Sequence, residues 1–220
     1  MGGVIKKIIS FIIANKYKLI VVIVLIVAVS GGLFYWNQRE NNSWQKAEDY
    51  YRRADYKKAA EELKNVSFPD DVERLRIYGQ TMYATNDYTK STKAYDKLFE
   101  KTKDPFAKLM VGNIANQKKD YEKAVKQYTE LINLYPNYVT AYSNLAMVYR
   151  LKGDLNQALA TAEKGITNNS TNTEMRVLKV SLLASTEETK NSIQYTEALE
   201  GLKKLDPKNP YITQIEAENQ

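Results

Sequence analysis

Hydrophobic residues recur along most of the chain at spacings of three and four, which is the period of an α-helix. One clear example is the face made by Tyr142, Leu145, Ala146 and Tyr149. Gly153 and Asp154 then interrupt the pattern, and a glycine at this point favours the left-handed conformation that ends a helix. A second helical pattern follows through Ala158 and Ala162. The pattern predicts an all-α fold built from helical hairpins.

The hairpin pattern is repeated along the chain. The segment 120–124 (DYEKA) recurs in related form at 154–158, 87–91 and 55–59, with spacings of 32, 33 and 34 residues. A helix–turn–helix unit with a period of about 34 residues is the signature of tetratricopeptide repeats (TPR). Residues 40–207 therefore resemble a TPR domain.

This resemblance implies about five stacked hairpins that form a right-handed superhelix with a groove, because a single hairpin cannot bury its apolar face alone. Small residues such as Ala124 and Ala158 are expected where the two helices of a hairpin approach closely. The last unit is degenerate, as in a capping repeat. Residues 208–220 are expected to form either a capping helix or a frayed tail.

The resemblance also implies which residues face the groove, since the first helix of each TPR hairpin lines it. The candidate partner-binding residues are Trp44, Tyr51, Arg76, Tyr83, Asn113, Asn116, Met147 and Arg150, with Glu48, Gln80, Leu109 and Ser143 beside them. Amides bond to main chain, aromatic rings stack, and arginines pair with carboxylates. Such a surface suits an extended peptide or a helix of a protein partner.

Some TPR adaptors clamp a terminal carboxylate with two asparagines and several basic residues. Asn113 and Asn144 occupy the two asparagine positions. Leu109, Val177 and Ser181 stand where basic residues should be, so we do not expect this clamp here.

Residues 19–36 (LIVVIVLIVAVSGGLFYW) form an uncharged run that predicts a transmembrane helix. As a helix the run would span ~27 Å, close to the hydrocarbon core of a bilayer. The aromatic residues at its end favour the headgroup level. Two alternatives are a transmembrane helix that begins earlier and a signal peptide cleaved near 28–30. Residues 1–18 are predicted to be a basic cytoplasmic or interfacial segment.

The basic residues around this run predict its orientation. Lys6, Lys7, Lys16 and Lys18 precede the run, whereas only Arg39 follows it immediately. By the positive-inside rule, the N-terminus is expected in the cytoplasm and the TPR domain outside, in the periplasm of a bacterium with a single pass through the inner membrane.

Composition excludes several classes of function. Residues 1–39 hold five basic and no acidic side chains, which accounts for most of the net charge of +6. The nearly neutral remainder predicts no nucleic-acid partner. The chain has no Cys and no His, and it carries no recognisable catalytic motif. We therefore expect no enzyme activity, no metal site and no cofactor.

The layout resembles the YfgM-like family of bacterial periplasmic TPR proteins, through the segment 31–38 (GGLFYWNQ) followed by Ala47 and Tyr50. This resemblance implies an ancillary role at the protein translocon. An alternative is a structural subunit of an envelope machine, such as a flagellar-motor collar, a pilus or a secretion apparatus. An organelle import receptor would need the opposite orientation.

Overall fold

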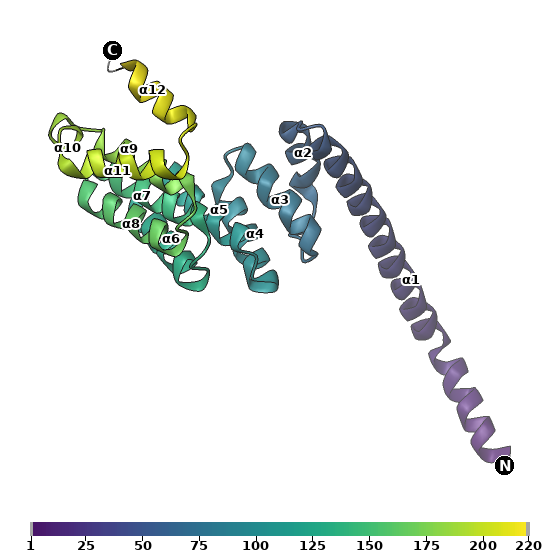
Figure 1. The fold of residues 1–220 in the computed structure, drawn as a ribbon. Helices are drawn as coiled ribbons and strands as arrows, with labels where there is room; N and C mark the ends of the chain where they lie inside the picture. The colour runs from purple at the N-terminus through teal and green to yellow at the C-terminus, as the bar shows by residue number, and fades with distance from the viewer. Residues whose placement is uncertain (1, 219–220) are drawn as a thin grey trace. The chain divides into compact units, whose positions relative to one another are not determined.

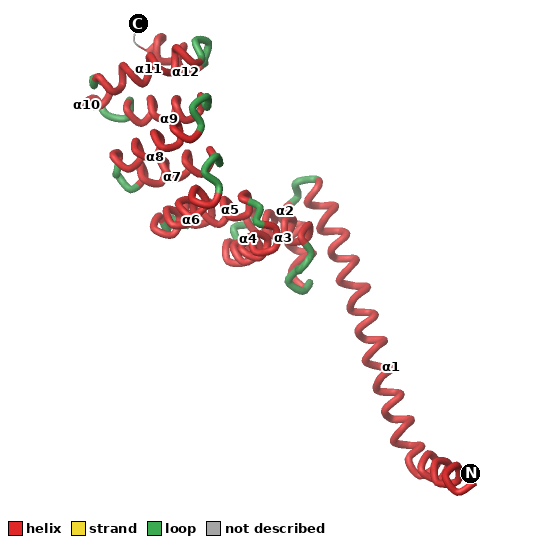
Figure 2. Tube along the Cα trace, turned by 60° about the horizontal axis from the view of Figure 1, so that its bottom comes forward, coloured by secondary structure: helices red, strands yellow, loops and turns green. Residues whose placement is uncertain are grey.

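The computed structural model describes residues 2–218, so the outermost positions of the predicted end segments, 1 and 219–220, lie outside it. Within the described residues the chain forms helices and loops without any strand (Figures 1 and 2). It divides into two compact units, with the boundary between Phe68 and Pro69. We call them unit 1 and unit 2 and describe each by itself.

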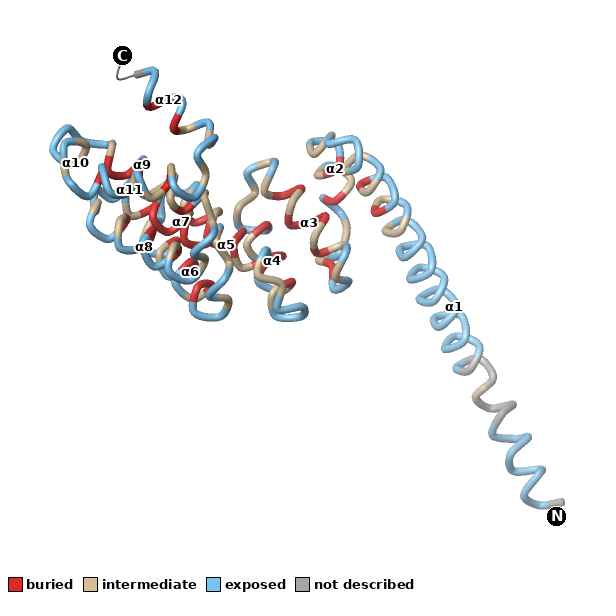
Figure 3. Tube along the Cα trace, in the orientation of Figure 1, coloured by how far each residue is buried: buried red, intermediate tan, exposed pale blue. Residues whose placement is uncertain are grey.

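Unit 1 begins with one long helix, α1 (Gly2–Arg52). The helix runs without interruption through the apolar segment and the first predicted repeat helix, because no proline lies before Pro69. From Ile20 to Arg52 it is long and apolar enough to cross a membrane, judged by length and composition alone. The apolar side chains from Ile20 to Trp36 are exposed along this stretch (Figure 3).

The end of α1 forms a hairpin with α2 (Tyr56–Glu62), which is followed by the short 3₁₀ helix η1 (Leu63–Asn65). Ala47 and Ala59 are completely buried, so the two helices approach each other through small side chains. A loop residue, Ser67, is tied to the Glu40 carboxylate through its hydroxyl and through its backbone N–H at 3.1 Å.

Unit 2 contains the remaining helices. They are α3 (Val72–Ala84), α4 (Tyr88–Thr102), α5 (Pro105–Gln117), α6 (Tyr121–Leu134), α7 (Val139–Leu151), α8 (Leu155–Asn168), α9 (Thr173–Leu183), α10 (Glu187–Lys190), α11 (Ile193–Leu205) and α12 (Pro210–Glu218). They pair as the hairpins α3/α4, α5/α6, α7/α8 and α9/α11, with α10 in the connection of the last pair. The predicted all-α fold of hairpins stacked in series is confirmed.

The same local device closes the turns of the first three hairpins of unit 2. Asp87, Asp120 and Asp154 each cap the second helix, their carboxylates accepting from the backbone N–H three residues later at 3.0–3.2 Å. The residue before each aspartate has a positive φ, for example 59° at Lys119 and 80° at Gly153. This turn explains why aspartate marks the repeat in the sequence.

Within two hairpins, a tyrosine of the second helix lies against a glycine of the first. A Cβ atom added at Gly112 would lie 2.5 Å from the ring of Tyr128, and one at Gly79 would lie 3.1 Å from the ring of Tyr95. Both tyrosines are buried. Glycine is therefore required at 112 by the close approach of the ring.

Successive hairpins then stack against one another. Each second helix contacts the next first helix, and the first helices also touch one another, α5 with α7 and α7 with α9. A continuous core from Leu109 to Leu182 runs through these hairpins. At the end of the unit, Ile212 and Ile215 of α12 are buried in a cluster with residues of α9 and α11.

The glycine–tyrosine contact predicts that Gly112→Ala destabilises the protein. We expect the free energy of unfolding to fall by about 1–3 kcal/mol, since the added methyl group has no room beside Tyr128. Gly201→Ala is the matched control: its Cβ would lie 3.6 Å from the nearest side-chain atom, an ordinary contact. Denaturant unfolding followed by circular dichroism measures both, and an unchanged midpoint for Gly112→Ala would contradict the packing.

Candidate partner-binding site

A polar recess opens on unit 2 where α5 and α7 lie side by side. Its volume is about 230 Å³, and its lining residues are Tyr83, Asn113, Asn116, Gln117, Tyr128, Asn144 and Met147. Four of the residues predicted from the sequence are thus brought together: Tyr83, Asn113, Asn116 and Met147. We call this cavity the amide recess.

Hydrogen bonds hold the side chain of Asn113 in place within the amide recess. Its Oδ1 accepts hydrogen bonds from the hydroxyl of Tyr128 on α6 at 2.6 Å and from Nδ2 of Asn144 on α7 at 2.8 Å. Three helices therefore hold one side chain, which sets the direction of its amide group. A site held in this way loses little side-chain entropy when it binds a ligand.

Burial raises the pKa of the Tyr128 hydroxyl, so the group stays protonated and keeps donating to Asn113. All the lining residues of the amide recess are formally neutral at pH 7. Asn116 also lines the recess, but its Oδ1 is buried and receives no hydrogen bond, so this oxygen is not exposed to a ligand. An unpaired buried acceptor costs about 1–3 kcal/mol.

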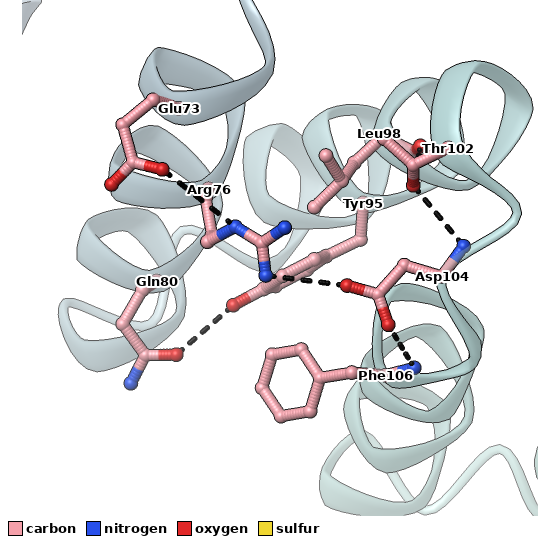
Figure 4. A network of polar contacts seen from close by, with 8 residues as sticks. All are labelled: Glu73, Arg76, Gln80, Tyr95, Leu98, Thr102, Asp104 and Phe106. Carbon is pink, nitrogen blue, oxygen red and sulfur yellow. Dashed lines mark hydrogen bonds and ion pairs between the residues drawn. The ribbon is translucent and has the colours of Figure 1, made fainter.

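Arg76 is held in a second network, at the junction of α3 and α5 (Figure 4). Its Nη1 donates to Oδ2 of Asp104 at 3.2 Å, while Oδ1 of Asp104 caps α5 by accepting from the N–H of Phe106. Nearby, the hydroxyl of Tyr95 donates to Oε1 of Gln80 at 3.0 Å. Arg76 therefore ties two hairpins together, and its side chain remains 40% exposed.

The other predicted residues, Trp44, Tyr51 and Arg150, do not line the amide recess. Trp44 is only 1% exposed, which corrects the expectation that its ring faces a groove: it belongs to the buried core. Tyr51 is half-buried in unit 1, where its ring meets Tyr56 edge-on at 5.9 Å. Arg150 is exposed on the last turn of α7, one turn after Met147.

Three lining residues, Gln117, Tyr128 and Asn144, are absent from the predicted groove set. Tyr128 lies on a second helix, which the assignment of groove positions to first helices leaves out. The repeat nevertheless contains a sequence pattern that indicates the role of Tyr128. Gly112-Asn113 with Tyr128 matches Gly79-Gln80 with Tyr95, and in both cases the hydroxyl bonds to the residue after the glycine.

A family model described as "TPR repeat" matches residues 112–153, and one described as "Tetratricopeptide repeat" matches residues 139–172. The chain contains tetratricopeptide repeats. The matched residues include most of those that line the amide recess, from Asn113 to Met147, whereas Tyr83 of α3 lies outside the match.

Other proteins are similar to this chain in sequence. The chain is 26% identical over 148 residues to the TPR repeat-containing protein YpiA of Bacillus subtilis (strain 168). The aligned region covers 66% of this chain but only 34% of YpiA. The chain therefore matches about a third of that relative's length.

Among solved structures, the crystal structure of MamA protein matches with a TM-score of 0.59 and 19% identity, over 81% of this chain and 96% of that one. MamA 41-end from Desulfovibrio magneticus RS-1 gives a TM-score of 0.59 and 16% identity, over 78% and 97%. These likenesses show the fold alone.

Nothing in the described residues resembles a metal centre: no group of three or more Asp, Glu, Cys or His side chains lies close enough to hold an ion there. The amide recess offers neutral hydrogen-bonding groups and a thioether instead. This is the chemistry of recognition, since amide groups bond well to main chain and no lining group is a strong acid or base.

The buried tyrosines predict how stability depends on alkaline pH. Burial raises the pKa of Tyr78, Tyr128, Tyr138 and Tyr142 in the folded state. Their contribution to stability is complete below the unfolded pKa of about 10 and is lost as pH rises above it toward the folded values. We expect the melting midpoint to fall above pH ~10, and to fall less steeply in Tyr128→Phe. Identical pH slopes for the two proteins would contradict the role of Tyr128.

Proposed function

We propose that this chain is a scaffold that holds an extended segment of a protein partner across α5 and α7. The observation that carries the proposal is the amide recess, where Asn113 is held by Tyr128 and Asn144 on TPR hairpins. TPR repeats support binding to protein partners, and we propose the amide recess as the position of that binding.

The chemistry of the recess favours peptide main chain over charged groups. An extended peptide presents alternating N–H donors and C=O acceptors, which amide side chains match one for one. A charged group would find no opposite charge among the neutral lining residues. Met147 is 36% exposed and offers a soft apolar contact for a partner side chain. Arg150, one turn further on, can meet an acidic residue beside the bound segment.

The apolar part of α1 supports a second element of the proposal, attachment to a membrane. Its exposed Val, Ile and Leu side chains are unfavourable in water, whereas the hydrocarbon core of a bilayer accommodates them. The basic residues before this stretch favour a cytoplasmic N-terminus, which would place the TPR repeats on the extracytoplasmic side.

The resemblance around 31–38 supports a role beside the protein translocon, with passing clients as the bound partners. A subunit of an envelope machine would instead hold one fixed partner. Purification in mild detergent distinguishes the two, because translocon subunits or machine components would copurify.

The partner-binding role predicts a position-specific crosslink. A photoreactive p-benzoylphenylalanine at Met147 should form discrete adducts in living cells, whereas the same residue at Leu134 should not. Leu134 is a matched control, since it is an exposed apolar residue, 57% exposed, on α6.

Combining Gln117→Glu with the photoreactive residue at position 147 should reduce the crosslinked adducts several-fold, because the substitution places a charge in a neutral recess. Equal adducts at both positions, or adducts indifferent to Gln117→Glu, would refute the amide recess as the binding site.

Membrane attachment predicts that the full chain sediments with membranes and resists extraction by alkaline carbonate. Replacing Val24 and Val27 by arginine should release it, since each charge costs about 2.5–3.5 kcal/mol at the centre of a spanning helix. Soluble behaviour of the unmodified chain would show that α1 does not anchor it. Protease treatment of spheroplasts reports the orientation: digestion of the TPR repeats is expected.

A further inference from the structure

A second recess lies between α8 and the last hairpin, and residues of α8, α9 and α11 line it. It shares no lining residue with the amide recess. Its volume is about 350 Å³, larger than that of the amide recess. Charged side chains from all three helices line it, together with an apolar wall made by Ile166 and Ala198. We call it the arginine recess, after Arg176 on α9.

Arg176 carries more hydrogen-bond donors than the structure uses. A guanidinium has five N–H groups, and it is always charged in a protein. Here Nη2 donates to the carbonyl of Ser170 at 3.1 Å, while Nε is buried without any acceptor. A guanidinium in a recess with unused donors matches a planar anion, because a carboxylate can accept two of its N–H groups at once.

The other charges of the recess do not neutralise Arg176. Lys179 pairs with Glu163 at 3.0 Å, so each of these is already partnered. Glu197 also lines the recess, and no ion pair joins it to Arg176 in the described structure. Two glutamates near the cavity disfavour a doubly charged phosphate and are compatible with a singly charged ligand.

Gly201 on α11 keeps the space beside the guanidinium open. A Cβ atom there would lie 3.6 Å from Nη1 of Arg176, so any longer side chain would occupy the volume next to the charge. The apolar wall would then contact the group that is covalently attached to the anion. The recess therefore suits a small molecule or chain end with one negative charge and a short apolar group.

We propose that the arginine recess binds a carboxylate ligand, with Arg176 as the residue that receives the carboxylate. The carboxylate belongs either to the C-terminal residue of a peptide or to a free small acid, and the chemistry of recognition is the same for both. The proposal is independent of the amide recess, because the two cavities share no lining residue.

The test uses the full chain in mild detergent with N-acetyl-leucinate as the probe. We expect saturable binding by calorimetry with a Kd of roughly 1 mM, and a shift of the Arg176 Nε–H signal in the NMR spectrum. N-acetyl-leucinamide, which lacks the charge, should bind at least ten-fold more weakly, as should inorganic phosphate. A tripeptide ending in leucine and its C-terminal amide then distinguish a chain end from a free acid.

Two variants connect the binding to the residues. Arg176→Lys should weaken binding about ten-fold, because it removes the fork of donors while keeping the charge. Gly201→Leu should abolish binding by filling the recess. Arg53→Lys, an equally conservative change at an exposed arginine of unit 1, should leave it unchanged.

Equal binding of acid and amide would overturn the proposal. So would wild-type affinity in Arg176→Lys, preference for phosphate, or no binding up to roughly 20 mM. A loss of affinity in Arg53→Lys would likewise show that the probe binds elsewhere. None of these results affects the Met147 crosslink, so the two proposals fail separately.

Discussion

The close contact between a glycine on one helix and a tyrosine ring on the next organises the centre of unit 2. At Gly112 the ring of Tyr128 occupies the space of a side chain, so the two helices are held at a short distance. The ring is buried while its hydroxyl reaches past the glycine to Asn113. One side chain thus packs the hairpin and also orients a surface amide. Interiors packed at this density leave little freedom for such a ring to move.

The amide recess and the stacking of the hairpins both follow from this contact. Because Tyr128 fixes Asn113 and Asn144 bonds to the same oxygen, the first helices of two neighbouring hairpins are joined at the recess itself. Arg76 and Asp104 join the preceding pair of hairpins near the N-terminal ends of α3 and α5. Stability and the proposed partner recognition therefore share residues in this array of hairpins, as expected where each repeat depends on its neighbours.

Much of the fold could be predicted from the sequence, because aspartate caps and small residues recur with the period of the hairpin. The details of the surface could not, since they depend on which neighbour a side chain meets. Trp44 matches a groove position by register but is buried, whereas Tyr128 matches a core position and still reaches the recess. The arginine recess is harder still to predict from the sequence. It forms where Arg176 lies beside Gly201 in a degenerate repeat, and the spacing of hydrophobic residues does not indicate that contact.

The most direct test of this account is a double-mutant cycle between Gly112→Ala and Tyr128→Leu, with the free energy of unfolding as the measured quantity. If the glycine exists to admit the ring, Gly112→Ala should destabilise the wild-type chain but cost little once Tyr128 is leucine, giving a coupling of about 1–2 kcal/mol. Additive effects of the two substitutions would contradict the account, because they would mean that the helices are held at their distance by something else.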